Sequence, residues 1–225
     1  MQYSNSNSAC LQFPESEGSY TGEWRLDKRH GHGCMAWPCG LRYEGQFRED
    51  HRHLVTGKMT FPGGEVYEGG WVGELMHGVG TYRTEGVVFK GKFVMGSMAG
   101  EGVLVFPDGA RYQGDIRDLK PTGQGHQHYP DQTQYQGQLH CGIRHGSGHL
   151  SYPNGDWYSG EWKDNLRDGY GTMHWANTKE MYEGMFAKGK RWGRGVLRNG
   201  RKEVVYDGMW REDEMEGSGV LITRA

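Results

Sequence analysis

The chain has 225 residues, of which 39 are glycine, and its hydrophobic fraction is only 35% although its aromatic fraction is 12%. This scarcity of aliphatic residues argues against an ordinary globule, and the eight tryptophans and thirteen tyrosines argue against a disordered chain. The net charge of -2 excludes a global attraction to nucleic acid or to a membrane.

The spacing of the cysteines and the length of the apolar runs indicate in which cellular compartment the protein resides. The four cysteines have no framework spacing, so we expect them to be reduced: Cys10, Cys34, Cys39 and Cys141. No run approaches the roughly 20 apolar residues of a membrane span, and the polar segment 1–9 is unlike a signal peptide. We therefore expect a cytoplasmic protein.

One signature returns along the chain: aromatic-x-Gly-x-apolar, followed by Gly-x-Gly. Its nine starts, which define repeats one to nine, are Tyr20, Tyr43, Tyr67, Phe89, Tyr112, Tyr135, Tyr158, Tyr182 and Tyr206. The starts lie 22 to 24 residues apart, and a fixed period of this length indicates a repeat architecture. We expect a disordered N-terminal segment over residues 1–10 and a repeat array over 11–225, which begins with a partial repeat over 11–19.

Repeat seven illustrates the unit that we expect. Side chains alternate between the two faces of a strand, so Tyr158, Gly160 and Trp162 share one face. Residues 163–167 are polar and predict a turn, after which the odd-numbered residues of 169–175 return to that same face. Each repeat is therefore predicted to be a β-hairpin with one aromatic, glycine-rich face and one polar face.

Glycine separates the aromatic residues on that face. We expect a side chain there to occupy the space over which a neighbouring ring lies, and aromatic cover of strand glycines is a known compensation. Each glycine costs about 1 kcal/mol in a helix, which argues against helical repeats. Consecutive hairpins predict an all-β fold, an elongated single-layer antiparallel meander of about nine hairpins that forms a twisted rod or trough.

Three segments closely resemble the MORN repeat: Tyr20–Gly33, Tyr67–Gly80 and Tyr158–Gly171. The resemblance covers about residues 11–223 and recurs nine times. It implies elongated β-hairpin arrays of the kind used in scaffolding, dimerisation, membrane-associated organisation and cytoskeletal or flagellar assemblies. The chain most resembles MORN-only scaffold proteins, including those of protist cytoskeletons and flagella.

Two regions depart from the repeat. Repeat two carries one extra residue before Gly57 and lacks the Gly-x-Gly pair. Repeats five and six have Ile116 and Leu139 where an aromatic residue is usual. We expect the array to bend or loosen at these positions.

The sequence predicts a protein that is not an enzyme. The segment 184–190 is similar to the start of a phosphate-binding loop, but Arg191 follows instead of Ser or Thr, and the segment fills an ordinary hairpin position. No arrangement of residues suggests a nucleophile with its base. The favoured function is a non-catalytic scaffold that homodimerises and organises a cytoskeletal or membrane-adjacent assembly. Its expected partners are cytoskeletal or other scaffold proteins, and not nucleic acid.

A single-layer sheet cannot bury both of its faces, so we expect a partner to cover part of the aromatic face. The expected anchors lie four residues after the repeat starts: Trp24, Phe47, Trp71, Phe93, Trp162, Phe186 and Trp210. Two-fold pairing of copies is the commonest arrangement, and for that contact we favour Trp192 and Trp210 in the last repeats. The alternative is that the trough holds a partner helix, with Trp24, Phe47, Trp71 and Phe93 as its anchors.

The stretch 188–202 indicates an alternative function, a peripheral module that binds anionic phospholipids such as phosphoinositides. It holds seven basic residues and no acidic one. Such segments contribute about 1 kcal/mol per basic residue at an anionic membrane surface. The candidate lipid contacts are Lys188, Lys190, Arg191, Arg194 and Arg198. The competing interpretation is a solvated basic end that is balanced by Glu203, Asp207 and the acidic residues of 212–216.

A cluster in repeats five and six has the residue types of a zinc site: His126, His128, His140 and Cys141. The paired Cys-x-x-Cys spacing that typifies structural zinc is missing. We therefore expect no metal or other cofactor, with zinc shared across a subunit interface as the alternative.

Overall fold

The computed structural model describes residues 18–52 and 56–222. The expected disordered segment 1–10 and residues 11–17 of the partial repeat lie outside the described residues. The chain divides into two compact units, one up to Pro107 and one from Asp108. In both units the described residues form strands and no helix, which confirms the all-β class.

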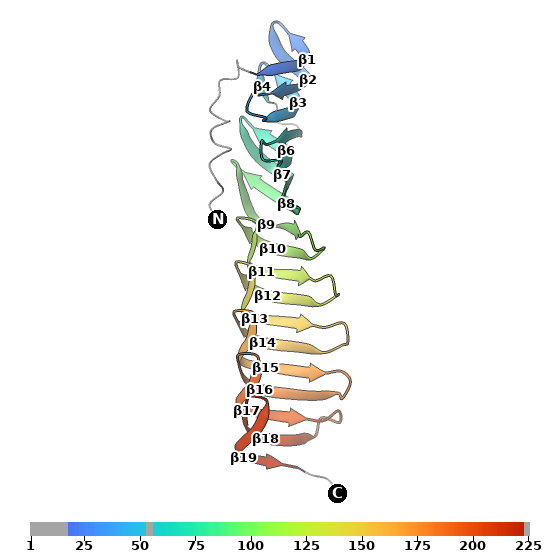
Figure 1. The fold of residues 1–225 in the computed structure, drawn as a ribbon, viewed down its shortest axis with the longest axis vertical. Coiled ribbons are helices and arrows are strands. Elements are labelled where there is room, and N and C mark those ends of the chain that lie inside the picture. Colours follow the sequence, from blue (N-terminus) through green and yellow to red (C-terminus); the bar gives the residue numbers. More distant parts are fainter. Residues whose placement is uncertain (1–17, 53–55, 223–225) are drawn as a thin grey trace. The chain divides into compact units, whose positions relative to one another are not determined.

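The first unit is a series of antiparallel hairpins (Figure 1). Its strands are β1 Ser19–Arg25, β2 Lys28–Ala36, β3 Arg42–Arg48, β4 His51–Arg52, β5 Gly57–Thr60, β6 Val66–Val72, β7 Leu75–Thr84, β8 Val87–Val94 and β9 Ser97–Val105. The irregular repeat two is visible here, since its second strand is divided into β4 and β5, and both of these short strands pair with β3.

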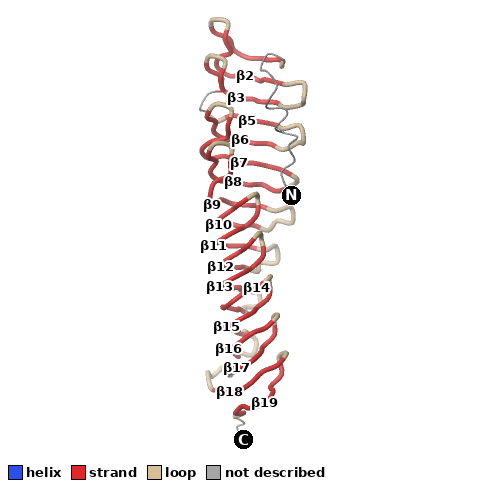
Figure 2. The backbone as a smooth tube through the Cα atoms, turned by 90° about the vertical axis from the view of Figure 1, so that its left-hand side faces the viewer, coloured by secondary structure: helices blue, strands red, loops and turns tan. Residues whose placement is uncertain are grey.

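The second unit is a more regular meander, in which each strand pairs with the next one along the chain (Figure 2). Its strands are β10 Arg111–Arg117, β11 Lys120–His128, β12 Gln134–His140, β13 Ile143–Ser151, β14 Trp157–Lys163, β15 Leu166–Trp175, β16 Glu180–Ala187, β17 Lys190–Arg198, β18 Val204–Arg211 and β19 Glu214–Leu221. Ile116 and Leu139 are buried in it at the positions that rings fill in other repeats.

The register of repeat seven confirms the predicted alternation, because Tyr158 lies opposite Met173 and Gly160 opposite Gly171. The turn is shorter than the predicted 163–167. Only Asp164 and Asn165 separate β14 from β15, and their φ angles are 51° and 68°. Two-residue turns with two positive φ angles match the twist of a β-hairpin and favour Asn, Asp and Gly.

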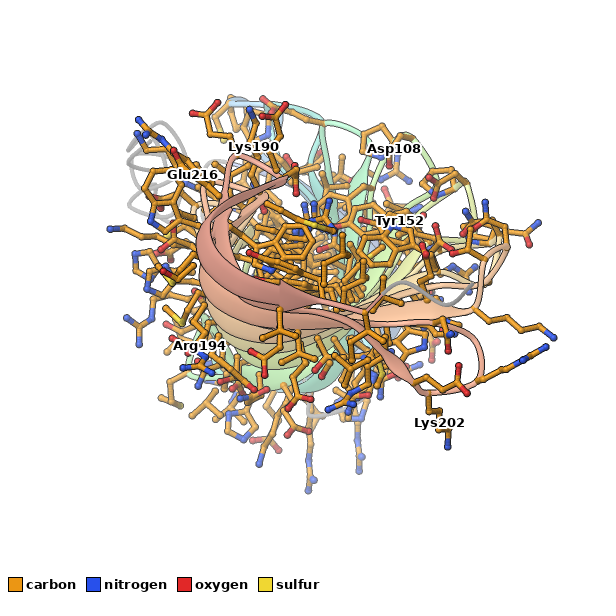
Figure 3. The ribbon with its side chains drawn as sticks, turned by 90° about the horizontal axis from the view of Figure 1, so that it is seen from below. Asp108, Tyr152, Lys190, Arg194, Lys202 and Glu216 are labelled. Atoms are coloured by element: carbon orange, nitrogen blue, oxygen red, sulfur yellow. The ribbon has the colours of Figure 1, made fainter. Side chains whose placement is uncertain are left out.

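The hairpins of every repeat except repeat two also carry a bulge at the same place, which bends them and which the sequence did not reveal. In repeat seven, Gly160 pairs with Gly171 and Trp162 with Arg167, so residues 168–170 of β15 lie opposite Glu161 alone. Extra residues on one strand bend it and increase its twist. In Figure 3 the strands of the second unit curl round the side chains on their concave side.

The concave side is filled by rings. Tyr158 packs edge-on against Trp162 of its own repeat, with 5.1 Å between the ring centroids, and against Phe186 of the next repeat at the same centroid distance. Edge-to-face pairs of this kind contribute about 0.5–1.5 kcal/mol beyond the area that they bury. Tyrosine therefore joins neighbouring repeats.

The glycines confirm the space argument. A Cβ atom placed on Gly160 would lie 2.6 Å from the Oη atom of Tyr158, and one on Gly171 would lie closer still. The Tyr158 hydroxyl donates a hydrogen bond of 2.9 Å to the carbonyl oxygen of Glu161. The paired glycines thus make the room in which the tyrosine ring lies flat against the backbone.

Candidate functional site: the outer face of the last repeats

The expected aromatic anchors do not form an open face. Six of the seven are buried within the chain, and only Trp24 is exposed, at 60%. The expectation of an uncovered aromatic face is wrong for those six, because the bent hairpins close over their own rings. Trp210 is only 3% exposed and so cannot form the expected contact between copies, whereas Trp192 is 43% exposed.

In repeats one, six and eight an arginine is hydrogen-bonded to the hairpin turn of the following repeat, a contact that was not predicted from the sequence. Arg191 donates to Asp213 from its backbone N–H and its Nε atom, 2.9 and 3.2 Å from Oδ1, and from Nη2, 2.8 Å from the carbonyl oxygen. Its guanidinium lies 4.1 Å from the centroid of the Trp210 ring, a cation–π distance. We call this arrangement an arginine clip.

The same three bonds join Arg29 to Asp50 and Arg144 to Asn165. The hydrogen bond from the Arg29 backbone N–H, followed by the Arg29 side chain, lowers the pKa of Asp50 below its usual value. A signal for the clips is present in the sequence: arginine nine residues after a repeat start, and Asp or Asn 21 or 22 residues beyond it.

The basic stretch does not form one patch. Arg191 is engaged in its clip, Lys190 lies 3.3 Å from Glu212, and Arg194 lies 3.4 Å from Asp207. Strand β17 runs from Lys190 to Arg198, and a nine-residue strand spans roughly 30 Å. In Figure 3, Lys190 and Lys202 accordingly lie on opposite sides of the hairpins. The five candidate lipid contacts are therefore divided and partly neutralised.

The zinc candidates are also separated. His126 and His128 lie on β11 opposite Gln136 and Gln134, away from the turn that follows His140. No group of three potential metal ligands occurs among residues 18–52 and 56–222. A zinc site built from this set would need ligands from a second chain.

The cysteines only partly match expectation. Cys34 and Cys141 are free thiols. Cys39, in the turn between β2 and β3, is disulfide-bonded, so the expectation of reduced cysteines is wrong for this residue. Within the described part of the chain, no helix has the length and apolar character that a membrane span requires.

Two open grooves lie on the second unit. One, of about 640 Å³, is lined by carboxylates and histidines that include Asp115, Asp164, His140 and His145. The other, of about 620 Å³, is lined mainly by amides, hydroxyls and glycine backbone. Among the described residues that line these two grooves there is no lysine or arginine. Neither groove therefore offers, among its described lining residues, the ammonium or guanidinium group that would pair with an anionic headgroup.

The outer face, opposite the rings, changes character in the last repeats. Three residues after their starts, repeats one to seven have Glu23, Gln46, Gly70, Lys92, Asp115, Gln138 and Glu161. Repeats eight and nine have Met185 and Met209 there. Tyr170 lies opposite Met185 in the register, and Arg194 lies opposite Met209.

We call Tyr170, Met185, Trp192 and Met209 the outer patch. Their exposed fractions lie between 41% and 50%. Ion pairs of both signs surround the outer patch: Lys190–Glu212, Arg194–Asp207 and Arg211–Glu216. In Figure 3 the labelled side chain of Arg194 points away from the curled strands. Exposed large apolar groups of this kind mark interaction sites.

Comparisons with known proteins agree with the architecture. The MORN repeat family model matches nine segments: residues 20–42, 43–66, 67–85, 89–111, 112–134, 135–157, 158–178, 182–200 and 206–223. Alsin from Mus musculus and from Homo sapiens is 32% identical over 45% of this chain. The match spans only 8% of the length of alsin.

Among solved structures, the G-box domain of the microcephaly protein CPAP aligns over 86% of this chain and 100% of its own, with a TM-score of 0.51. The identity is 17%, so this likeness concerns the fold alone.

Proposed function

Because this chain belongs to the MORN-repeat family, we propose that it is a non-catalytic scaffold whose copies pair through the outer patch and organise a cytoskeletal or membrane-adjacent assembly. The observation that carries the pairing is that a position with a polar residue in six of repeats one to seven has Met185 and Met209 in repeats eight and nine. The cytoskeletal or membrane-adjacent setting rests on the family alone.

A second copy of the chain is the occupant that best suits the outer patch. The surrounding ion pairs carry both signs and little net charge, which favours a surface of the same composition over a strongly charged one. A two-fold axis through the patch would place the acids of one copy near the bases of the other. Exposed ion pairs are worth only about 0–1 kcal/mol each, so they can exchange partners at little cost.

The scaffold is preferred to the phospholipid module. Lipid attraction depends on several unpaired basic groups close to one surface. Here Lys190, Arg191 and Arg194 already face acidic groups, and the strand β17 separates the two ends of the stretch.

Light scattering coupled to size-exclusion chromatography tests the pairing. We expect the unchanged chain to be a dimer and the double variant Tyr170→Glu/Trp192→Glu to be a folded monomer. The matched control is Val79→Glu/Val94→Glu, which places the same two charges at apolar residues of the first unit that are 80% and 41% exposed. A control that dissociates as fully as the Tyr170→Glu/Trp192→Glu variant, or a wild type that is monomeric at every concentration, would overturn the proposal.

A further inference from the structure

The side chain three residues after a repeat start has a defined place in the bend. Glu161 lies over the backbone of Gly169, so a Cβ atom on Gly169 would come within 2.6 Å of Oε2. The φ of Gly169 is 103°, a conformation that residues with a side chain rarely adopt. Its Oε1 atom accepts a hydrogen bond of 3.1 Å from the backbone N–H of Tyr170. The same bond is made in other repeats: Glu23 accepts from the N–H of His32 at 2.9 Å, and Gln138 accepts from the N–H of Ser147 at 3.2 Å.

Met185 and Met209 occupy this same place. A Cβ atom built on Gly193 would lie 3.6 Å from the Cβ atom of Met185, and one on Gly217 would lie 3.9 Å from that of Met209. A thioether sulfur is a poor acceptor, so neither methionine can replace the carboxylate or amide oxygen. Both side chains are nevertheless exposed at a position that the hairpin geometry shapes for a polar acceptor.

We propose that Met185 and Met209 are a site of reversible oxidation, at which conversion to methionine sulfoxide by a peroxide switches off the outer patch without disturbing the hairpins. This inference rests on the proposed pairing through the outer patch. In the reaction, a sulfur lone pair attacks one peroxide oxygen, the S–O bond forms and the O–O bond breaks. Sulfur is oxidised by two electrons and keeps that oxygen, while the other peroxide oxygen takes the hydroxyl proton from it and leaves as water. Reversal uses a thiol-dependent methionine sulfoxide reductase, which supplies two electrons and releases the sulfoxide oxygen as water.

The sulfoxide oxygen then has partners that the thioether lacks. By analogy with Glu161 and Tyr170, it can accept from the backbone N–H of Arg194, which lies in the bulge opposite Met185, and from that of Ser218, which lies in the bulge opposite Met209. The oxidised side chains thereby take up the interaction that glutamate and glutamine make elsewhere. The apolar surface of the outer patch is lost at the same time, because the sulfoxide is polar.

Core methionines would respond in the opposite way. Met173 is only 5% exposed, and its sulfur already accepts from Arg167 Nη1 at 3.5 Å, so an added sulfoxide oxygen would have to fit among packed side chains. Its oxidation would unfold the hairpin rather than switch a surface. The location of Met185 and Met209, and not the presence of methionine, makes oxidation a surface event.

The test compares three proteins by analytical ultracentrifugation before and after hydrogen peroxide: the wild type, Met185→Leu/Met209→Leu and Met185→Gln/Met209→Gln. Dithiothreitol is added to every sample, with or without prior peroxide, so that the Cys39 disulfide is treated alike throughout, oxidised thiols are restored and sulfoxides stay in place. We expect peroxide to weaken wild-type pairing by about tenfold or more, and the leucine variant to keep its affinity. The glutamine variant should pair weakly without any peroxide, and its melting temperature should stay within about 2 °C of the wild type.

Peptide mass mapping completes the test, with sulfoxide expected at Met185 and Met209 well before Met173. Methionine sulfoxide reductase should restore pairing of the oxidised wild type. If the wild type pairs and oxidation at both residues leaves its affinity unchanged, the switch is overturned while the scaffold stands. If the wild type never pairs, the pairing and its switch are both overturned. A glutamine variant that melts more than about 5 °C below the wild type would refute the acceptor geometry in either case.

Discussion

Arg191 and Asp213 are joined by three hydrogen bonds, which fasten β17 to the turn between β18 and β19. Asp213 has a φ of 73°, a left-handed conformation that Asp and Asn tolerate better than most residues. One aspartate therefore closes its own turn and holds the previous repeat.

Replacing Asp213 with alanine should remove the two bonds to Oδ1, from the Arg191 backbone N–H and Nε, and keep the bond from Nη2 to the backbone carbonyl. We expect this loss to lower the free energy of unfolding by about 1–2 kcal/mol. Urea denaturation measures the change. Asp213→Asn is the matched control, because Asn165 makes the same bonds to Arg144. Equal destabilisation by Ala and Asn would contradict the assignment.

Gln127 is expected to weaken the core of the second unit. It lies opposite Tyr112 and Tyr135, and its Oε1 atom is buried with no hydrogen-bond partner among the described residues. Gln127→Leu should raise the free energy of unfolding by about 1 kcal/mol, because leucine has no polar group to desolvate. Leu150→Gln, at the equivalent place in the next repeat, is the reverse control and should destabilise. A Gln127→Leu variant less stable than wild type would show that this side chain is satisfied in solution.

Gly171→Ala tests the room beneath the Tyr158 ring. The added methyl group would displace the ring or the backbone, so we expect a loss of about 1–3 kcal/mol. A double-mutant cycle with Tyr158→Leu separates this clash from general strain, since alanine should cost less once the ring is gone. If the two changes are simply additive, the ring does not set the need for glycine.

The core tyrosines should make the protein sensitive to alkali. Burial raises the pKa of Tyr182 to about 12, and that of Tyr135 likewise to about 12. The folded state thus keeps a proton that the unfolded state loses near pH 10. The resulting stability is complete below pH 10 and is lost as the pH rises from 10 towards 12.

Near-ultraviolet absorbance during an alkaline titration measures this effect, with circular dichroism to follow folding. We expect most tyrosinate to appear together with unfolding, whereas the chain in denaturant should titrate near pH 10. Full ionisation near pH 10 by a protein that keeps its β-sheet signal would disprove the burial argument.

Much of the hairpin could be predicted from sequence because strand parity is a strict period of two. The faces of Tyr158, Gly160 and Trp162, and the reason for the glycines, follow from that period and are confirmed. The bend could not be predicted in this way. It depends on three residues opposite Glu161 and on the φ of Gly169, and neither changes the apparent alternation.

The wrong prediction that the aromatic anchors are exposed arises because the bend of the hairpins was not predicted. A flat hairpin would leave Trp210 uncovered, and a bent one buries it against Tyr182 and Tyr206. The repeat signature is defined by rings and glycines on the inner face, and it does not include the outer face. The informative change there is from Glu161 to Met185 at equivalent positions. A comparison of equivalent positions between repeats, rather than of residue types alone, would have found both this change and the arginine clips.

The clips have a kinetic consequence. Each joins residues only 21 or 22 positions apart in the chain. Contacts that are this local close short loops, which keeps the contact order low for a protein made only of strands. Folding can therefore start at any neighbouring pair of hairpins and spread in both directions, instead of waiting for distant parts of the chain to meet.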